Sequence, residues 1–513
     1  MKLKSALPAV LLATLILLSA CAGAKEQQPA ATDGQTTGEQ SKTAEAAFAY
    51  FVEISKIPRG SGNEQAISDY LKAFGEERNF TTIQDDWLNI LIKKPGSAGR
   101  ENEPPIILQA HMDMVCDKNN DVEHDFLSAP IIPVINGDWV TAEKKTTLGA
   151  DNGVGLAMIL AILDADGLSH PPVEALITVE EETTAIGAVE FDISLLSGNR
   201  MVNVDSTEEG HFVVSSASGT TVEIIVPVEE ADIPDGFSFF ELAIRGLNGG
   251  HSGDDINKGF ANANVLMGRL LNELGETGIY LSEINGGSAL NAIPRECSAV
   301  ISLNDLSAAN SIIEQAQATF MAEYPVEEAL SITLAEAVAT GVIGGDSMQR
   351  VVGAITQMSN GVQSMSADIE GLVQTSSNLG MVASESGKVR LAAFARSSSP
   401  EDEARLLDSL RALADSINAV AEINKSVPAW PYKADSPLRD KMVEVYTAMY
   451  GEEPIIEAIH AGLETAEFAL KMPDCDMISI GPDIQNYHSP DERFSLSSFN
   501  RTCDYLVRVL EAI

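Results

Sequence analysis

The sequence predicts an α/β protein: a layered sandwich of helices on a partly parallel sheet, interrupted by a long α+β insertion. Between residues 44 and 218, short apolar strands alternate with helical stretches, an order typical of a parallel sheet covered by helices. From about residue 219 the pattern suits two successive βαββαβ units, and near residue 430 it changes back. Hydrophobic residues make up 45% of the 513-residue chain and charged residues 21%, so the chain can bury a large core.

The first part of the sandwich follows from the spacing of its apolar residues. Residues 44–77 carry apolar side chains at helical spacing. We then expect strands at 87–92 and 105–109, a buried helix at 153–165, and strands at 173–179 and 201–204. After residue 430 the chain returns to this part of the fold and ends in an amphipathic helix at 498–510.

The insertion is expected to hold two units of one type. The first unit has a strand, a helix, two strands, a helix and a strand, at 237–245, 261–273, 279–284, 297–303, 308–321 and 330–334. The second has a helix, two strands, a helix and a strand, at 348–358, 372–382, 388–396, 400–417 and 420–426. We therefore divide the folded chain at residues 44–218, 219–429 and 430–513, with the middle segment as an inserted lid.

The N-terminus has the pattern of a targeting segment. A short basic stretch precedes an apolar run at 7–20 that is too short to span a bilayer and is typical of a signal-peptide core. The run ends in Leu-Ser-Ala-Cys, which resembles a bacterial lipobox and implies cleavage before Cys21 and lipid modification of its thiol. Residues 1–20 would then be a signal peptide and residues 21–43 a flexible tether. This predicts an extracytoplasmic protein, lipid-anchored to the bacterial cell membrane; a secretory signal with an incidental cysteine is the alternative.

Charge and cysteine spacing exclude several classes of function. The chain has 33 Lys and Arg residues against 75 Asp and Glu residues, a formal net charge of −42, which repels nucleic-acid phosphates and anionic lipid headgroups. The remaining cysteines form no Cys-x-x-Cys pair, so a cysteine-based metal site is excluded and buried free thiols are expected. These cysteines are Cys116, Cys297, Cys475 and Cys503. Any metal or acid–base site must draw on seven histidines, at positions 111, 124, 170, 211, 251, 460 and 488.

The first candidate for that chemistry is the pair His111 and Asp113. The pair comes after the strand at 105–109, at the strand end where α/β sheets place their sites. Residues two apart in an extended segment face the same way, so Asp113 can orient the imidazole and strengthen it as a metal ligand. A surface His–Asp contact is the alternative for this short motif.

Four more clusters stand after predicted strands or open helices. Asp151 stands in a glycine-rich turn at a helix start, where a capping carboxylate is the alternative. Three adjacent carboxylates, Glu180 to Glu182, stand at the end of a buried strand and repel one another unless a cation compensates their charge. The alternative for this triplet is a solvent-exposed turn. Asp205 comes after another apolar strand, and His488 lies in a loop before the last helix.

Together these clusters offer two nitrogen and three carboxylate ligands. That set is enough for two divalent zinc-like ions if one carboxylate bridges them. The ligands are His111, Asp151, Glu182, Asp205 and His488. Glu181 is then left uncoordinated, and beside a metal-activated water it can act as general base and return the proton to a leaving amine.

Eight segments in order resemble the bacterial aminoacyl-histidine dipeptidases (Xaa-His dipeptidases of the dipeptidase D type). The segments are LQAHMDMV, TTLGADNGVGLA, ALITVEEE, NVDSTEEG, GLNGGHSGDDI, NAIPRE, IHAGLE and SIGPDIQNYHSPDE, and the similarity covers residues 44–513. The resemblance implies a di-zinc aminopeptidase-like α/β sandwich with an inserted α+β lid and dimerisation domain.

The resemblance also implies roles for the strand-end residues. His111 and Asp205 would bind one metal, Glu182 and His488 the other, with Asp151 bridging, Asp113 orienting His111 and Glu181 acting as the catalytic base. The triplet leaves two registers, Glu180–Glu181 or Glu181–Glu182, and counting back from Gly187–Ala188 favours the second. Thr184 stands where the family usually has glycine, which puts the local loop geometry in doubt.

In the lid, the resemblance gives His251 a part in oxyanion stabilisation. In this clan such a histidine commonly enters from a partner subunit, which implies a homodimer. Asn291 and Arg295 resemble lid residues near the substrate, and His460 and Glu464 lie in the segment that recognises substrate termini. His124, His170 and His211 match no family ligand and are interpreted as structural or surface histidines.

The sequence therefore predicts a metal-dependent dipeptidase that uses two divalent ions, expected to be Zn²⁺, on short peptides, Xaa-His dipeptides among them. One alternative is an N-acyl amino-acid or amide hydrolase of the same clan, because metal ligands do not specify the acyl group. A second is a lipoprotein that captures peptides without cleaving them. The expected partners are the peptide and a second subunit, with the membrane reached only through the lipid anchor and with no nucleic acid.

Overall fold

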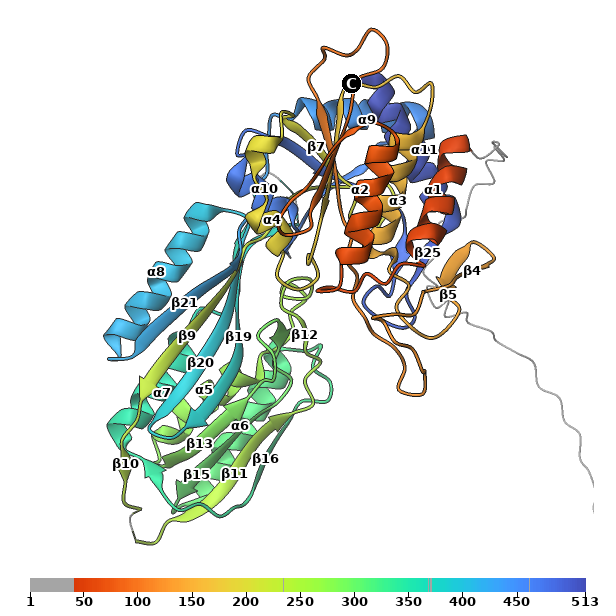
Figure 1. The fold of residues 1–513 in the computed structure, drawn as a ribbon. Helices are drawn as coiled ribbons and strands as arrows, with labels where there is room; N and C mark the ends of the chain where they lie inside the picture. Colours follow the sequence, from red (N-terminus) through yellow and green to blue (C-terminus); the bar gives the residue numbers. More distant parts are fainter. Residues whose placement is uncertain (1–40, 234, 368, 370, 461) are drawn as a thin grey trace, which may run out of the picture. The chain divides into compact units, whose positions relative to one another are not determined.

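The computed structural model describes residues 41–513 except residues 234, 368, 370 and 461. The predicted signal peptide, Cys21 and nearly all of the predicted tether lie outside the described residues. The described part is built on two large sheets, one of eight and one of nine strands (Figure 1). This arrangement confirms the predicted fold class, an α/β sandwich with an inserted α+β region.

The eight-stranded sheet carries strands from both ends of the described chain. In spatial order its strands are β1 (Thr81–Gln84), β2 (Ile90–Lys94), β6 (Val173–Thr178), β3 (Ile106–His111), β7 (Arg200–Asn203), β23 (Asp476–Ser479), β8 (His211–Ser216) and β22 (Ile455–Ile459). Strand β3 runs parallel to both β6 and β7, so these three strands end at the same edge of the sheet.

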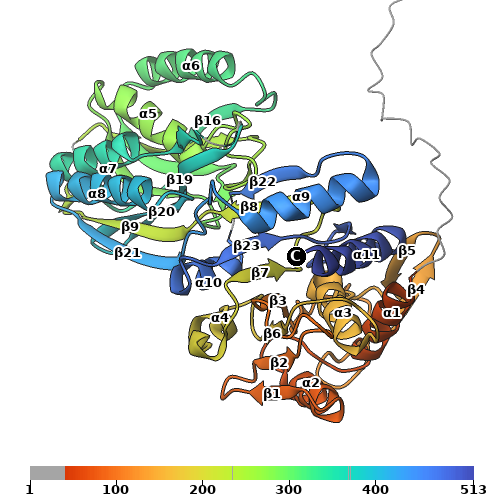
Figure 2. The same cartoon turned by 90° about the horizontal axis from the view of Figure 1, so that it is seen from above.

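Helices cover both faces of this sheet (Figure 2). One face carries α1 (Lys42–Ile54), α3 (Ala150–Asp164), α9 (Pro437–Tyr450) and α11 (Leu496–Ala512), with α2 (Gln65–Glu77) beside β1 and β2; the other carries α4 (Ile186–Glu190) and α10 (Thr465–Lys471). Successive side chains of β3 alternate between the faces: Ile106 and Leu108 pack in one core cluster, and Ile107 packs in the other. Burial on both faces explains the continuous apolar runs of these strands.

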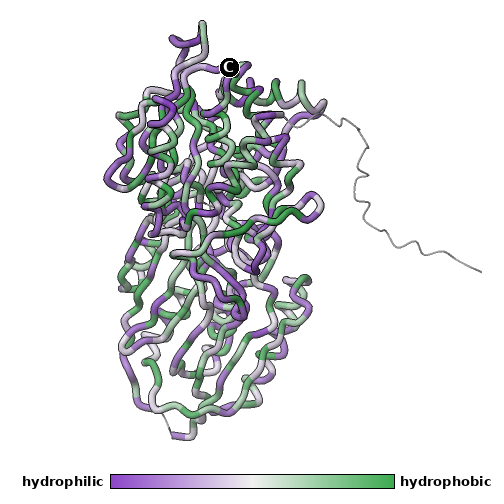
Figure 3. Tube along the Cα trace, turned by 45° about the vertical axis from the view of Figure 1, so that its right-hand side comes forward, coloured by the Kyte–Doolittle hydropathy of each residue, from purple (hydrophilic) through white to green (hydrophobic). Residues whose placement is uncertain are grey.

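The nine-stranded sheet is covered on one face by four helices. Its strands in spatial order are β16 (Ser331–Glu336), β11 (Ser238–Arg245), β15 (Cys297–Leu303), β13 (Tyr280–Gly286), β19 (Val373–Glu385), β20 (Lys388–Ser397), β9 (Gly219–Pro227) and β21 (Val420–Val427), and β18 (Gly361–Met365) pairs with β19. The helices are α5 (Ala263–Gly275), α6 (Leu306–Glu323), α7 (Gly345–Gln357) and α8 (Pro400–Ser416). Hydrophobic and hydrophilic residues alternate along the strands (Figure 3), as a sheet with one packed face requires.

The two βαββαβ units are nested, which differs from the expected succession. The inner unit is β11-α5-β13-β15-α6-β16, and the outer unit is β9-α7-β19-β20-α8-β21. Strand β9 precedes the inner unit in sequence but pairs with β20 and β21, which come after it. The units join where β13 pairs with β19, at Asn285 opposite Ala383 and Gly286 opposite Val382.

Three small sheets complete the described fold. They are β24 (Ile484–Gln485), β25 (Arg493–Ser495), β5 (Trp139–Ala142) and β4 (Pro133–Asn136) in one, β10 (Glu230–Ala231) with β17 (Val342–Ile343) in another, and β12 (Gly250–His251) with β14 (Ala292–Ile293) in the third. A short 3₁₀ helix, Ile193–Leu195, precedes β7.

The buried residues support the proposed division at residues 219 and 429. The buried members of one core cluster lie between residues 222 and 414, and those of the other two lie before residue 215 and after residue 429. The partly buried Ile369 and Val427 of the middle segment also pack against these two clusters. Cys297, Cys475 and Cys503 are buried free thiols as expected, whereas Cys116 is free but exposed because it lies in a loop after β3.

Candidate metal centre

The residues predicted at strand ends come together at one edge of the eight-stranded sheet. His111 is the last residue of β3, the Glu180–Glu182 triplet comes after β6, and Asp205 comes after β7. Asp151 stands at the start of α3, where its φ of −81° and ψ of 111° lie outside the helical region. His488 is in the loop between β24 and β25.

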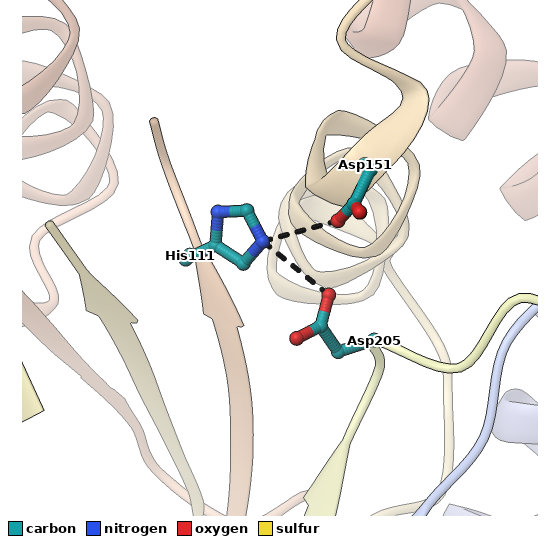
Figure 4. Close-up of side chains that lie close together, drawn as sticks. All are labelled: His111, Asp151 and Asp205. Atoms are coloured by element: carbon teal, nitrogen blue, oxygen red, sulfur yellow. Dashed lines mark hydrogen bonds and ion pairs between the residues drawn. The ribbon is translucent and has the colours of Figure 1, made fainter. Parts of the chain in front are cut away.

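His111 is the centre of the first group of candidate ligands. Its side chain points between Asp151 and Asp205 (Figure 4). The Nε2 atom lies 3.1 Å from Asp151 Oδ1 and 3.4 Å from Asp205 Oδ1. One nitrogen and two carboxylate oxygens at this spacing can hold a metal ion together.

His488 is the centre of the second group. Its Nε2 atom lies 2.8 Å from Glu182 Oε2 and 3.3 Å from Asp151 Oδ2. Asp151 therefore turns one oxygen toward His111 and the other toward His488, which is the arrangement of a bridging carboxylate. Glu180 instead accepts hydrogen bonds from threonine hydroxyls, including that of Thr184 at 3.2 Å, so the geometry favours the Glu181–Glu182 register.

Glu181 lies beside the ligands and lines the same cavity. Its Oε2 atom is 4.0 Å from His111 Nε2. The cavity has a volume of about 650 Å³, and Asp151, Glu182 and His488 also line it. Burial raises the pKa of Glu181 well above the usual carboxyl value. A carboxyl group in this position can hold or release a proton next to a reacting molecule.

The described residues fit a pair of divalent cations. No lysine or arginine is among the described residues that line the cavity, although several carboxylates converge there. Glu182 Oε1 is buried without a hydrogen-bond partner in the described structure. Burial raises the pKa of Asp205 to about 6, and hydrogen bonds to Asp151 and Glu182 raise the pKa of His488 to about 10. This charge imbalance and this donor set are those of a site that binds cations through nitrogen and oxygen.

Asp113 is fully buried and holds the ligand segments in place. Its Oδ1 atom lies 3.3 Å from His111 Nδ1 and accepts from the Glu181 backbone N–H at 3.1 Å. Its Oδ2 atom accepts from the Ser61 hydroxyl at 2.7 Å and from the Glu182 backbone N–H at 3.3 Å. One side chain thus contacts both the imidazole and the backbone of the carboxylate triplet.

We expect Asp113→Asn to weaken Zn²⁺ binding by about 10- to 100-fold, because an amide presents a donor to groups that all donate. Competition with a chromophoric chelator measures the affinity. Asp138→Asn is a control at an exposed aspartate remote from the ligands, since Asp138 likewise accepts from a hydroxyl, that of Ser495, and from the Ser497 backbone N–H at 2.9 Å, at the start of α11. Equal affinities in the two variants would contradict the role of Asp113.

The predicted lid histidine reaches the cavity from the same chain. His251 lines the cavity, and its Nε2 atom lies 3.4 Å from an Nη2 atom of Arg396. This chain's own His251 thus lies at the cavity, and the supply of such a histidine by a partner subunit and the homodimer that it implies stay predictions.

The other predicted substrate residues do not line the metal cavity. His460 is buried, with Nε2 2.7 Å from the Ser376 hydroxyl, and burial lowers its pKa to about 4. Glu464 is buried behind the site and accepts from Gln109 at 2.6 Å and Thr178 at 2.7 Å. Two further residues, Asn291 and Arg295, lie in the lid, and Arg295 lines a separate cavity there.

The three histidines interpreted as structural or surface residues lie apart from the ligand groups, as expected. His170 is buried and its Nδ1 lies 2.7 Å from the Pro171 carbonyl oxygen, and His124 packs edge-on against Phe126. His211 lies 3.0 Å from Glu457, a residue of the cavity wall.

Three further candidate functional residues, Arg396, Arg59 and Glu492, were not predicted from the sequence. Arg396 is 6% exposed and its Nε atom has no partner among the described residues. Arg59 and Glu492 are buried beneath the ligand segments and bind their backbone. Glu492 could have been noticed at the end of the HSPDE segment, whereas Arg59 carries no sequence signal.

Comparison with known proteins identifies relatives along almost the whole chain. Residues 107–512 match the model of peptidase family M20/M25/M40. The "Cytosol non-specific dipeptidase" of Escherichia coli K12 is 36% identical over 471 residues, covering 90% of this chain and 96% of that protein. The crystal structure of an aminoacylhistidine dipeptidase from Vibrio alginolyticus has a TM-score of 0.88 and 36% identity, covering 92% of this chain and 98% of that one. The aminopeptidase PepT of Bacillus cereus, at 15% identity and a TM-score of 0.54, shares the fold.

The comparison contradicts the predicted location. The E. coli relative is named for the cytosol, whereas the N-terminal pattern predicted an extracytoplasmic lipoprotein. This finding contradicts three predictions, which are therefore wrong: a signal peptide, lipidation at Cys21 and a membrane partner. An apolar run before a cysteine is a short pattern, so it carries less information than similarity over nine-tenths of the chain. Within the described residues, no helix has both the length and the apolarity needed to cross a membrane.

Proposed function

The chain belongs to peptidase family M20/M25/M40, and from this premise we propose that it is a dipeptidase that uses two divalent metal ions. The observation that carries the proposal is the position of Asp151, whose two oxygens face His111 and His488, with Glu181 beside them. Two relatives at 36% identity, both named dipeptidases, support peptide bonds as the substrate over N-acyl amino acids, and they support catalysis over peptide capture.

We assign the ligands by the two groups. His111 and Asp205 would hold one ion, Glu182 and His488 would hold the other, and Asp151 would be shared by both. Histidine and carboxylate ligands suit Zn²⁺, which we propose as the metal. When bound, the ions supply a water of lowered pKa and polarise the carbonyl of the scissile bond.

Glu181 is the proton carrier of the proposed reaction. It takes a proton from the attacking water and gives it to the departing amine, which requires a carboxyl group near the reacting atoms and bound to no metal. His251 lies on the lid side of the cavity, where its imidazole can stabilise negative charge that develops on the carbonyl oxygen.

Arg396 does not itself line the cavity but lies beside His251, which does, and it offers the positive charge that the carboxylate of a dipeptide needs. A guanidinium group binds a carboxylate through two parallel hydrogen bonds, and Arg396 is the buried arginine next to His251. Burial lowers the pKa of Arg396 to about 10, which leaves it charged at neutral pH. We propose that it binds the C-terminal carboxylate of the substrate, which limits cleavage to short peptides.

We expect complete metal removal to abolish hydrolysis of dipeptides, and added Zn²⁺ to restore it. The purified protein is assayed on a panel of dipeptides, Xaa-His members included, before and after chelation, with longer and N-acylated peptides as comparison substrates. Activity in protein verified to be metal-free would contradict the proposal. Faster turnover of N-acylated amino acids than of any dipeptide would favour the amide-hydrolase alternative.

A further inference from the structure

Glu492 binds the backbone of the segment that carries Asp151. Its side chain is 3% exposed. The Oε2 atom accepts from the backbone N–H groups of Leu148 at 2.6 Å and Gly149 at 2.9 Å, and Oε1 accepts from those of Ala150 at 2.7 Å and Asp151 at 3.2 Å. One carboxylate thus satisfies four consecutive N–H groups, and it fixes the direction in which the Asp151 side chain leaves the backbone.

Arg59 binds the same segment from its other side. Its side chain is 2% exposed. The Nη2 atom donates to the Gly149 carbonyl at 2.5 Å, and Nη1 donates to the carbonyls of Met112 at 2.9 Å and Asp113 at 3.0 Å. Arg59 therefore connects the Asp151 segment to the end of β3, where His111 stands.

Gly149 leaves the room that this arrangement requires. A Cβ atom at Gly149 would lie 2.6 Å from Arg59 Nη2 and 2.7 Å from Met114 Sδ. Its φ of +69° also lies in the left-handed region, which side-chain-bearing residues rarely adopt. The glycine-rich turn of this chain is thus shaped around a buried arginine, besides carrying a metal ligand.

We propose that Glu492 and Arg59 are positioning residues that hold Asp151 between the two metal positions. Glu492 is four residues after His488 in sequence, so the same short segment supplies a ligand and fixes the shared one. Glu492 positions two ligands, Asp151 and His488, of the ion at the second group. Glu492 positions only one ligand, Asp151, of the ion at His111, because the other two ligands, His111 and Asp205, are placed by the ends of strands.

This inference rests on the proposed function, since it takes the ligand assignment as its premise. The test compares Zn²⁺ binding to metal-free wild type and Glu492→Gln by calorimetric titration, with Co²⁺ absorption spectra as a second readout of ligand geometry. In the variant, an amide nitrogen faces backbone N–H groups in place of an oxygen. We expect the ion at His488 to bind about 10- to 100-fold more weakly, with an altered Co²⁺ spectrum, and the ion at His111 to be weakened by a smaller factor.

Glu174→Gln is the matched control. Glu174 is also a buried glutamate, and it accepts from the backbone N–H groups of Ser197 and Gly198, both at 2.9 Å, at the opposite end of β6. The Glu174→Gln substitution perturbs comparable buried hydrogen bonds, and it should leave both Zn²⁺ affinities unchanged. If Glu492→Gln does not fold, Arg59→Lys is measured in the same way, because a lysine cannot reach all three carbonyls.

The outcomes separate the two proposals. A wild type that binds fewer than two ions overturns both the proposed metal pair and this inference. A wild type that binds two ions, together with a Glu492→Gln variant that binds both with unchanged affinity, overturns the inference alone. Equal weakening of both ions, or equal losses in Glu492→Gln and Glu174→Gln, also overturns it, because either result indicates general destabilisation.

Discussion

Glu181→Gln is expected to lower kcat for dipeptide hydrolysis by about 10²- to 10⁴-fold, the contribution typical of a general acid–base group. Glutamine keeps the shape of the side chain but cannot carry the proton from water to amine. Because Glu181 is not one of the assigned ligands, the variant should still contain both metal ions. Steady-state kinetics and metal analysis on the same samples test both parts of this expectation.

Glu180→Gln is the control for that experiment. Glu180 is the neighbouring carboxylate, but it bonds to threonine hydroxyls instead of facing the ligands, so its removal should leave kcat close to that of the wild type. If Glu180→Gln were inactive and Glu181→Gln active, the other register of the triplet would be correct. A Glu181→Gln variant that lost its metal would instead make Glu181 a ligand.

Asp151→Ala is expected to lose both bound ions and, with them, all measurable hydrolysis. The substitution removes the oxygen facing His111 and the oxygen facing His488, so neither group keeps its full set of ligands. Elemental analysis after dialysis measures the metal content. Thermal unfolding of the metal-free proteins shows whether the fold survives.

Asp205→Ala is the comparison for Asp151→Ala. Asp205 approaches His111 at 3.4 Å and belongs to that group alone. This variant should therefore lose one ion and keep the ion at His488. Identical metal contents in the two variants would show that Asp151 does not bridge.

The strand-end residues could be predicted from sequence because two local patterns coincide there. Apolar runs mark β3, β6 and β7, and because these strands are parallel neighbours, the residues at their carboxyl ends meet at one edge of the sheet. His111, Glu182 and Asp205 are brought together for this reason. The sequence also singled out Asp151 at a helix start and His488 in a loop, and the resemblance to a known family then implied their places in the two ligand groups. Their approach to the strand ends depends on loops.

Other features depend on contacts that local patterns do not record. Arg59 and Glu492 act on backbone atoms, which every sequence possesses, so residue spacing does not predict their role, although Glu492 ends the HSPDE segment. The nesting of the lid depends on the pairing of β9 with strands more than 150 residues later, a long-range choice that apolar alternation leaves open. Arg396 lies on β20 and pairs there with Ser376 of β19, and its approach to His251, 145 residues earlier, is a long-range contact of the same kind.

The nested lid has a consequence for the order in which the chain can fold during synthesis. The inner unit, from β11 to β16, is contiguous and can pair its strands as soon as Glu336 has left the ribosome. Strand β9 can pair with its neighbours only after β20 and β21 have been synthesised. Strands β7 and β8 likewise require β23, which lies between them in the sheet. The loop with His488 emerges later still. Nascent chains that stop before this loop can thus hold a folded inner unit and the ligands of the His111 group while lacking the His488 ligand of the second group.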